Sequence, residues 1–355
     1  MKRTTERRIA FAALLLVLVG ALAGCGGTAP ATPAPDLGPN LLIESQEPVS
    51  LKRDGWTDYV PVSLGAKVRQ GDLIRPDEGQ EVKILCSDLS LKTVKGESGC
   101  PCKAKEPVLV YGPARMLTPR GQDLRQIPYI LYPRNTAVLE ERPALRWHDT
   151  GASGYTVEIG QGGRTIWQQK GVPGTEMRYP DDAPALQPGA DYLLTVTDET
   201  SGHHSGEDPA KGLGFQVLGA EEQATVEAQR DQILALPVDE PARRFALAVY
   251  YAGQRLRGDA LAILDEVSAG LDSPAVHLWR GDLLAAMQLP DEAEAAYRAA
   301  LAKAQAVEDR ETEAAAQVGL CRVTGQADWL EKAIQATEAL GDREQADKLR
   351  AEGCR

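Results

Sequence analysis

The spacing of hydrophobic residues changes three times along this 355-residue chain, and each change marks a different kind of segment. Residues 9–23 form an almost unbroken apolar run. Between residues 41 and 219, short alternations of apolar and polar residues are separated by Gly, Pro and Asp, which predicts short half-buried strands. From residue 220 onward, apolar residues recur about every 3.6 positions, which predicts amphipathic helices.

These patterns predict a multidomain β + α protein, in which two small all-β domains precede an α-helical solenoid. The predicted divisions are a leader (1–24), a tether rich in Pro, Gly and Ala (25–40), a first β domain (41–132), a second β domain (133–219) and a helical domain (220–355). The length supports several domains, because one domain usually holds about 100–200 residues. The tether contains four prolines among small residues, a composition that favours extended backbone over a packed core.

The net charge of the chain and its sequence motifs restrict the classes of function that we expect. The chain has 51 acidic and 39 basic residues, and removal of the leader leaves 50 and 35, a net charge of −15. Such a chain repels phosphate backbones and anionic lipid, so we expect no nucleic-acid binding and no membrane binding by charge. A nucleophile elbow, phosphate loop, metal-binding helix or catalytic-triad signature is not found in the sequence. We therefore expect a protein that is not an enzyme and has no cofactor.

The leader ends at a cysteine. Four basic residues precede the apolar run, which at about 15 residues is shorter than the roughly 18–20 that span a bilayer and is typical of a secretory signal. The run leads into Leu22-Ala23-Gly24-Cys25, which resembles the lipobox of bacterial lipoproteins. The resemblance implies cleavage before Cys25, acylation of its thiol and an extracytoplasmic, membrane-anchored protein. An ordinary signal peptide with an incidental cysteine is the alternative, and Gly26 leaves open which membrane is used.

The first β domain contains recognisable turn chemistry. Gly71-Asp72-Leu73-Ile74 forms a predicted turn and apolar pair, and Val82, Ile84 and Cys86 alternate along the next predicted strand. The run from residue 62 to residue 94 resembles the FecR-type β domain, although Asp88-Leu89-Ser90 stands where that family has Asp-Gly-Ser. FecR proteins signal through a membrane-spanning helix and a cytoplasmic segment that we do not find, so the resemblance predicts the fold and not the signalling role.

Lipidation of Cys25 would leave five cysteines for other roles. They are Cys86, Cys100, Cys102, Cys321 and Cys354. In an oxidising compartment we expect a disulfide from Cys86 to either Cys100 or Cys102 and a second from Cys321 to Cys354, with one thiol left over. A metal site and a redox-active Cys-Pro-Cys pair are alternatives, but the spacing is a poor match to zinc sites and the surroundings are not thioredoxin-like.

The second β domain carries regularly placed aromatic residues. Pro143-x-Leu145-x-Trp147, then Gly154-Tyr155, then the turn leading to Tyr192 resemble a fibronectin type III domain. The resemblance implies a β-sandwich with Trp147, Tyr155 and Tyr192 in its core. A glycan-binding platform would need such aromatics to be exposed, whereas alternation places them inward.

Histidines offer weak metal-site candidates. His203 and His204 lie near Glu207 and Asp208, but adjacent strand side chains point apart and the stretch is typical of a solvated hairpin tip. His277 lies on a periodic helical face beside Trp279, where packing is the simpler interpretation.

The helical domain contains one clear repeat. Residues 275–284 and 289–301 resemble a tetratricopeptide repeat, with Gly281 at the close-packing position, Ala293-x-x-x-Tyr297 as the signature and Ala300 one turn later. The resemblance implies small residues where two helices touch and an aromatic ring that fills the gap to the next helix. A preceding pair near residues 245–264, a weaker pair over 311–340 and a last helix as cap complete the expected array.

Taken as a whole, the sequence predicts a lipid-anchored cell-envelope protein that acts as a non-catalytic adaptor, with a groove of the helical array offered to a protein segment. The alternative is a lipoprotein that binds glycan or cell-wall polymer through its β domains. A third hypothesis is an envelope enzyme that uses Cys100 and Cys102 as a redox pair.

Overall fold

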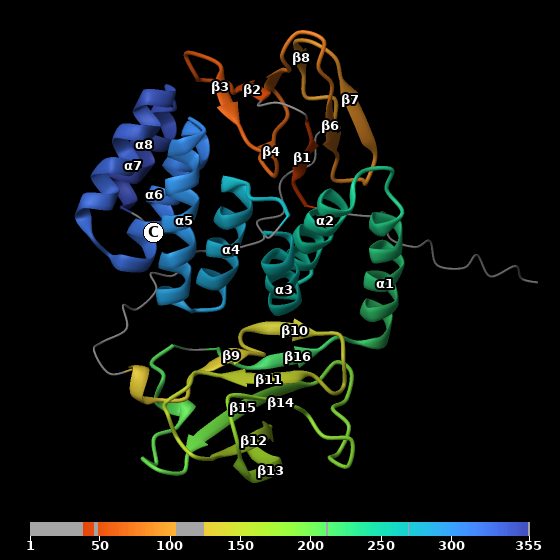
Figure 1. The fold of residues 1–355 in the computed structure, drawn as a ribbon, viewed down its shortest axis with the longest axis vertical. Coiled ribbons are helices and arrows are strands. Elements are labelled where there is room, and N and C mark those ends of the chain that lie inside the picture. Colours follow the sequence, from red (N-terminus) through yellow and green to blue (C-terminus); the bar gives the residue numbers. More distant parts are fainter. Residues whose placement is uncertain (1–37, 46–48, 104–123, 211, 269, 354–355) are drawn as a thin grey trace, which may run out of the picture. The chain divides into compact units, whose positions relative to one another are not determined.

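The computed structural model describes residues 38–45, 49–103, 124–210, 212–268 and 270–353. The predicted leader, Cys25 and most of the tether lie outside these residues. Within them, several small antiparallel sheets occupy the N-terminal half and a region of packed helices follows (Figure 1). This order confirms the predicted fold class.

The first β unit comprises strands β1–β8. They are β1 (Asn40–Glu44), β2 (Val49–Lys52), β3 (Val60–Val62), β4 (Lys67–Val68), β5 (Leu73–Arg75), β6 (Val82–Leu85), β7 (Leu91–Val94) and β8 (Ser98–Gly99). The described strands form two antiparallel sheets, in the orders β4-β1-β6-β7 and β3-β2-β5-β8. Val82 and Ile84 of one sheet share a hydrophobic cluster with Leu51 and Ile74 of the other, so alternate residues of both sheets fill one core.

The second β unit comprises strands β9–β16. They are β9 (Ile130–Tyr132), β10 (Thr136–Val138), β11 (Ala144–Trp147), β12 (Tyr155–Gln161), β13 (Arg164–Val172), β14 (Glu176–Arg178), β15 (Asp191–Asp198) and β16 (Phe215–Val217), with short 3₁₀ helices at Leu124–Gln126 and Ser205–Glu207. The sheets run β10-β16-β15-β12-β13 and β14-β11-β9. Trp147, Tyr155 and Tyr192 are buried between them, as predicted, at 1%, 0% and 4% exposure.

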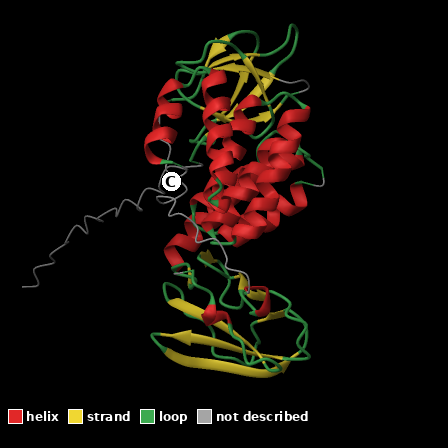
Figure 2. Ribbon diagram, turned by 90° about the vertical axis from the view of Figure 1, so that its left-hand side faces the viewer, coloured by secondary structure: helices red, strands yellow, loops and turns green. Residues whose placement is uncertain are grey.

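The helices follow the predicted pairs. They are α1 (Ala220–Leu234), α2 (Glu240–Gly253), α3 (Arg257–Val267), α4 (Pro274–Ala286), α5 (Pro290–Ala306), α6 (Arg310–Thr324), α7 (Ala327–Leu340) and α8 (Arg343–Glu352). Successive helices from α2 to α8, the helical array, pack side by side (Figure 2). Side chains of Asp239, Ser273 and Asp309 cap the first amides of α2, α4 and α6, which explains where these helices begin.

Hydrophobic clusters cross the predicted domain boundaries. Leu41 and Leu85 of the first β unit share a cluster with Phe245 of α2. Tyr129, which precedes β9, shares another with Tyr297 of α5. All described residues belong to one compact unit. The β strands and the helices therefore stabilise each other, while the exact boundaries at residues 132 and 219 stay a prediction.

Candidate functional site

Tyr297 organises the centre of the helical array. Its ring lies against two glycines on neighbouring helices, because a Cβ atom built on either Gly281 of α4 or Gly319 of α6 would lie 2.5 Å from a ring carbon. Its hydroxyl donates a hydrogen bond of 2.9 Å to Asp282 Oδ1. Ala293 and Ala300 of the same helix are fully buried. Small residues therefore admit one large ring between α4 and α6, the arrangement that the repeat resemblance implies.

Sequence reasoning singled out Gly281 and missed Gly319. Both positions carry the same signal in the sequence, which is a glycine inside an otherwise helical pattern. A glycine in such a place usually has a packing reason. Gly319 lies in the weaker predicted pair over residues 311–340, where Thr337 stands in place of the aromatic residue that follows the signature alanine in the resemblance.

One face of the helical array is built from α2, α4 and α6, the first helix of each pair, and we call it the docking face. The turn between β3 and β4, residues 63–66, and Lys67 at the start of β4 lie on it. Ser63 donates its amide to Asp309 Oδ2 at 3.1 Å. The carbonyl of Leu64 accepts a hydrogen bond from Ser273 Oγ, and the carbonyl of Gly65 accepts one from Trp279 Nε1 at 3.4 Å. The helices thus hold this segment largely through its backbone.

Gly65 is required at the closest point of this contact. A Cβ atom there would lie 2.9 Å from Phe245 Cζ and 3.1 Å from Ala275 Cβ. The residue also has a φ of +92°, a conformation that favours glycine. Both steric space and backbone conformation therefore exclude a larger residue.

Charges of opposite sign face each other across the same contact. Lys67 places its ammonium 4.3 Å from the centroid of the Trp279 ring. Arg53 forms ion pairs with Glu311 of α6 and with Asp72, and it donates to the carbonyl of Lys67 at 2.8 Å. The β unit contributes the cations and the helices contribute the carboxylates Asp282, Asp309 and Glu311, so the contact is electrostatically complementary.

Burial shifts the pKa values of these groups. Desolvation raises the pKa of the Asp282 carboxyl, which the positive charge of Lys67 opposes. Desolvation likewise raises the pKa of Glu311 against the opposing effect of Arg53, and it lowers the pKa of the Lys67 ammonium. Each charge at this contact consequently depends on its partner from the other element.

An open pocket of about 330 Å³ adjoins the segment. Residues 61–64 and 270–274 line it, together with Leu42, Ser45, Val49 and Val307. Val307 is 47% exposed and is one of four exposed large apolar residues among those that the structure describes. The lining is mostly apolar, with Ser45, Ser63, Asp272 and Ser273 as polar exceptions.

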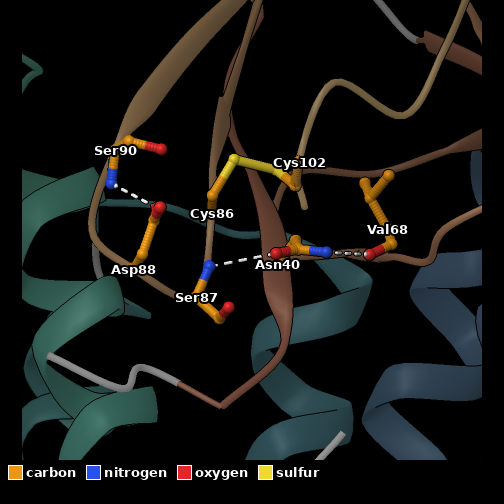
Figure 3. The surroundings of a disulfide bond; sticks show 7 residues. All are labelled: Asn40, Val68, Cys86, Ser87, Asp88, Ser90 and Cys102. Atoms are coloured by element: carbon orange, nitrogen blue, oxygen red, sulfur yellow. Dashed lines mark hydrogen bonds between the residues drawn. A yellow bond between two sulfur atoms is a disulfide. The ribbon is translucent and has the colours of Figure 1, made fainter. Parts of the chain in front are cut away.

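The cysteines of the first β unit form one disulfide. Cys86 is bonded to Cys102, one of the two predicted pairings, beside Asn40, which joins the ends of β4 and β6 through Val68 and Ser87 (Figure 3). Cys100 is the free cysteine among the described residues, and burial raises the pKa of its thiol. Cys321 is disulfide-bonded, and its predicted partner Cys354 lies outside the described residues. These bonds indicate an oxidising, extracytoplasmic environment.

The predicted histidine candidates make local contacts. His203 Nδ1 lies 2.9 Å from Glu207 Oε2, and His204 caps the short helix at Ser205–Glu207. His277 Nε2 lies 3.2 Å from Asp272 Oδ1. Asp208 is instead buried against Arg134, which sequence reasoning missed. Across the described ranges, no cluster of three or more His, Cys, Asp or Glu side chains has the geometry of a metal site.

In the described part of the chain, no helix combines the length and apolar character needed to cross a bilayer.

No protein-family model matches the chain, and no curated protein is significantly similar to it.

Proposed function

We propose that this protein is a lipid-anchored, non-catalytic envelope protein that binds an extended segment of a partner protein on the docking face of its helical array. The observation that carries the proposal is the backbone-mediated contact between residues 63–67 and α2, α4 and α6. Ser273, Trp279 and Asp309 hold a turn of the chain there through its amide and carbonyl groups. Helical arrays of stacked pairs commonly use such a face to bind peptides.

The place of action follows from the leader and the disulfides. The lipobox-like sequence ending at Cys25 supports attachment of the mature chain to a membrane by lipid. The Cys86–Cys102 disulfide supports a location outside the cytoplasm. The tether between Cys25 and β1 would hold the folded unit at a distance from the lipid surface.

Photo-crosslinking in native envelopes tests this function. A photoreactive residue at Val307, beside the pocket, should crosslink to a discrete partner protein. The same residue at Leu193, which is 50% exposed on the second β unit, should not. Point variants of the full chain are required, because removal of residues 220–355 would expose the cores that the β units share with the helices.

A Cys25→Ser variant serves as the second control. Loss of the lipid anchor should move the protein out of the membrane fraction. It should also reduce the yield of partner protein crosslinked at position 307. Crosslinks that are the same at Val307 and Leu193, or that are absent from both, would contradict the proposed function.

A further inference from the structure

A free thiol lies two residues from the disulfide of the first β unit. Cys86, which directly follows β6, is bonded to Cys102 (Figure 3), and Cys100 is the free cysteine in the described part of the chain. Cys100 packs against the same hydrophobic cluster that contains Cys86 and Cys102. The amide of Cys102 also donates a hydrogen bond to the sulfur of Cys100. The three sulfur atoms therefore belong to one cluster, in which a thiol that can act as a nucleophile lies beside a disulfide that it can attack.

The alternative pairing of Cys86 with Cys100 requires only a short movement. The Cα atoms of Cys86 and Cys102 are 5.4 Å apart. A disulfide joins Cα atoms that are about 4.4–6.8 Å apart. Cys100 precedes Cys102 by two residues, which even a fully extended chain separates by about 7 Å at most. A slide of the chain by this length would bring Cys100 to the position of Cys102.

The segment that carries Cys100 is weakly held. It follows β8, an exposed two-residue strand at the edge of the sheet β3-β2-β5-β8. β8 pairs with Leu73 and Ile74 of β5, and the amide of Cys100 donates to the carbonyl of Asp72 at 2.9 Å. A Cβ atom built on Gly99 would meet nothing within 4 Å, so there is open space beside the strand. A short edge strand with few contacts can open locally while the rest of the fold stays in place.

We propose that the first β unit contains a thiol–disulfide switch, in which Cys100 and Cys102 exchange as the partner of Cys86. The Cys100 thiolate attacks Sγ of Cys86, so that the Cys86–Cys100 bond forms while the Cys86–Cys102 bond breaks. Cys102 leaves as a thiolate and takes up the proton that Cys100 gave to solvent. The numbers of disulfides and thiols do not change, so the exchange needs no oxidant or reductant. The proposal goes beyond the proposed function and does not rest on it.

The two pairings give different structures at this edge of the sheet. With Cys100 bonded to Cys86, β8 is shifted relative to β5, and the hydrogen bond from the Cys100 amide to the Asp72 carbonyl is lost. The free thiol then belongs to Cys102. The switch therefore changes both the strand pairing and the position of the reactive sulfur.

The pKa of the Cys100 thiol makes the exchange slow at neutral pH. Burial raises this pKa, the hydrogen bond from the Cys102 amide opposes the increase, and the negative charge of Asp72, which pairs with Arg53, adds to it. Attack requires the thiolate, so the rate of exchange should rise about tenfold for each pH unit below that pKa.

Differential alkylation of the full mature chain tests the proposal. Excess N-ethylmaleimide blocks the free thiols and stops the exchange, and reduction followed by iodoacetamide then marks the cysteines that had been bonded. Trypsin releases residues 96–103, GESGCPCK, which contain both Cys100 and Cys102. Fragmentation before Pro101 in the mass spectrometer separates the two cysteines and shows which one carries each label.

A brief pulse of N-ethylmaleimide at pH 7 should label mainly Cys100. With longer incubation before the pulse, the maleimide label on Cys102 should increase, and about tenfold faster at pH 8 than at pH 7. Cys321, which is bonded elsewhere in the chain, is the internal control and should stay free of maleimide. Maleimide confined to Cys100 at every time and pH would overturn the proposal. So would labelling of Cys321 at the same rate as Cys102, because it would indicate general reshuffling of disulfides.

A Cys102→Ser variant tests the alternative pairing by itself. In a buffer of reduced and oxidised glutathione, this variant should form the Cys86–Cys100 disulfide, and the matched control Cys100→Ser should keep the Cys86–Cys102 disulfide. A folded Cys102→Ser chain in which Cys86 and Cys100 both stay reduced, while Cys100→Ser is oxidised, would contradict the switch. Where Cys102→Ser does not fold, the labelling of the wild type decides.

Discussion

At the scale of single residues, Asp259 shows how burial changes chemistry. It lies in the first turn of α3, where desolvation, together with the negative charge of Glu140, raises the pKa of its carboxyl to about 6. The ring of Tyr132 packs on Gly258, the residue before Asp259, because a Cβ atom on Gly258 would lie 2.1 Å from that ring. Because the pKa of Asp259 is higher in the folded chain than in the unfolded chain, protonation of this carboxyl favours the folded state. Its contribution to the free energy of unfolding is fully present below about pH 4 and is lost as the pH rises to about 6.

Asp259→Asn should remove this pH dependence. Above pH 6 the variant should be more stable than the wild type by about 1–3 kcal/mol, because it avoids a buried negative charge, and below about pH 4 the two should be equal. Urea unfolding between pH 4 and pH 8 measures the difference.

Asp182→Asn, in an exposed loop, is the matched control and should track the wild type throughout. A constant difference between Asp259→Asn and the wild type across this pH range would show that the Asp259 carboxyl does not titrate as described.

At the scale of elements, Arg134 connects the turn between β9 and β10 to the turn between α4 and α5. Its side chain is fully buried and pairs with Asp208 at 2.9 Å. It also donates to the carbonyls of Met287 and Gln288 at 2.7 and 2.8 Å. These carbonyls end α4, so one guanidinium satisfies groups that a helix terminus leaves open.

Arg134→Ala should destabilise the protein by about 3–5 kcal/mol, because it removes the positive charge that pairs with the buried Asp208 carboxylate and the donors to two buried carbonyls. Arg134→Lys should recover little of this loss, since one ammonium lacks the planar set of donors. Arg178→Ala, which removes an exposed pair with Glu140, should cost less than about 1 kcal/mol. Denaturant midpoints measure all three, and a small loss for Arg134→Ala would mean that water replaces the guanidinium.

At the scale of the whole molecule, the shared cores predict cooperative unfolding. Leu41 and Leu85 pack with α2, and Tyr129 packs with α5. Units that share a core lose stability together when one of them unfolds.

Calorimetry of the mature chain should therefore show one transition, with a calorimetric enthalpy close to the van't Hoff enthalpy. Leu41→Ala should lower the midpoint seen by both near-UV signals of the second β unit and helical signals. Separate transitions for the β units and the helices would instead support independent domains.

What the sequence by itself determined was local in character. Periodicity of two and of about 3.6 placed the strands and helices, because these patterns depend on neighbours along the chain. Alternation placed Trp147 and Tyr155 in a core, and residue spacing identified Gly281 and Tyr297 as helix-packing candidates. The lipobox-like leader is a local pattern as well.

Only the tertiary structure decided the long-range pairings. It selected Cys102 over Cys100 as the partner of Cys86, a choice that depends on how the end of β8 passes β6. It placed the turn after β3 on helices more than 200 residues away, and it paired Arg134 with the end of α4. Such contacts depend on how elements that are distant in sequence lie relative to one another in space. The spacing of residues within one element does not encode these positions. At the docking face, they bring the turn after β3 into contact with α2, α4 and α6.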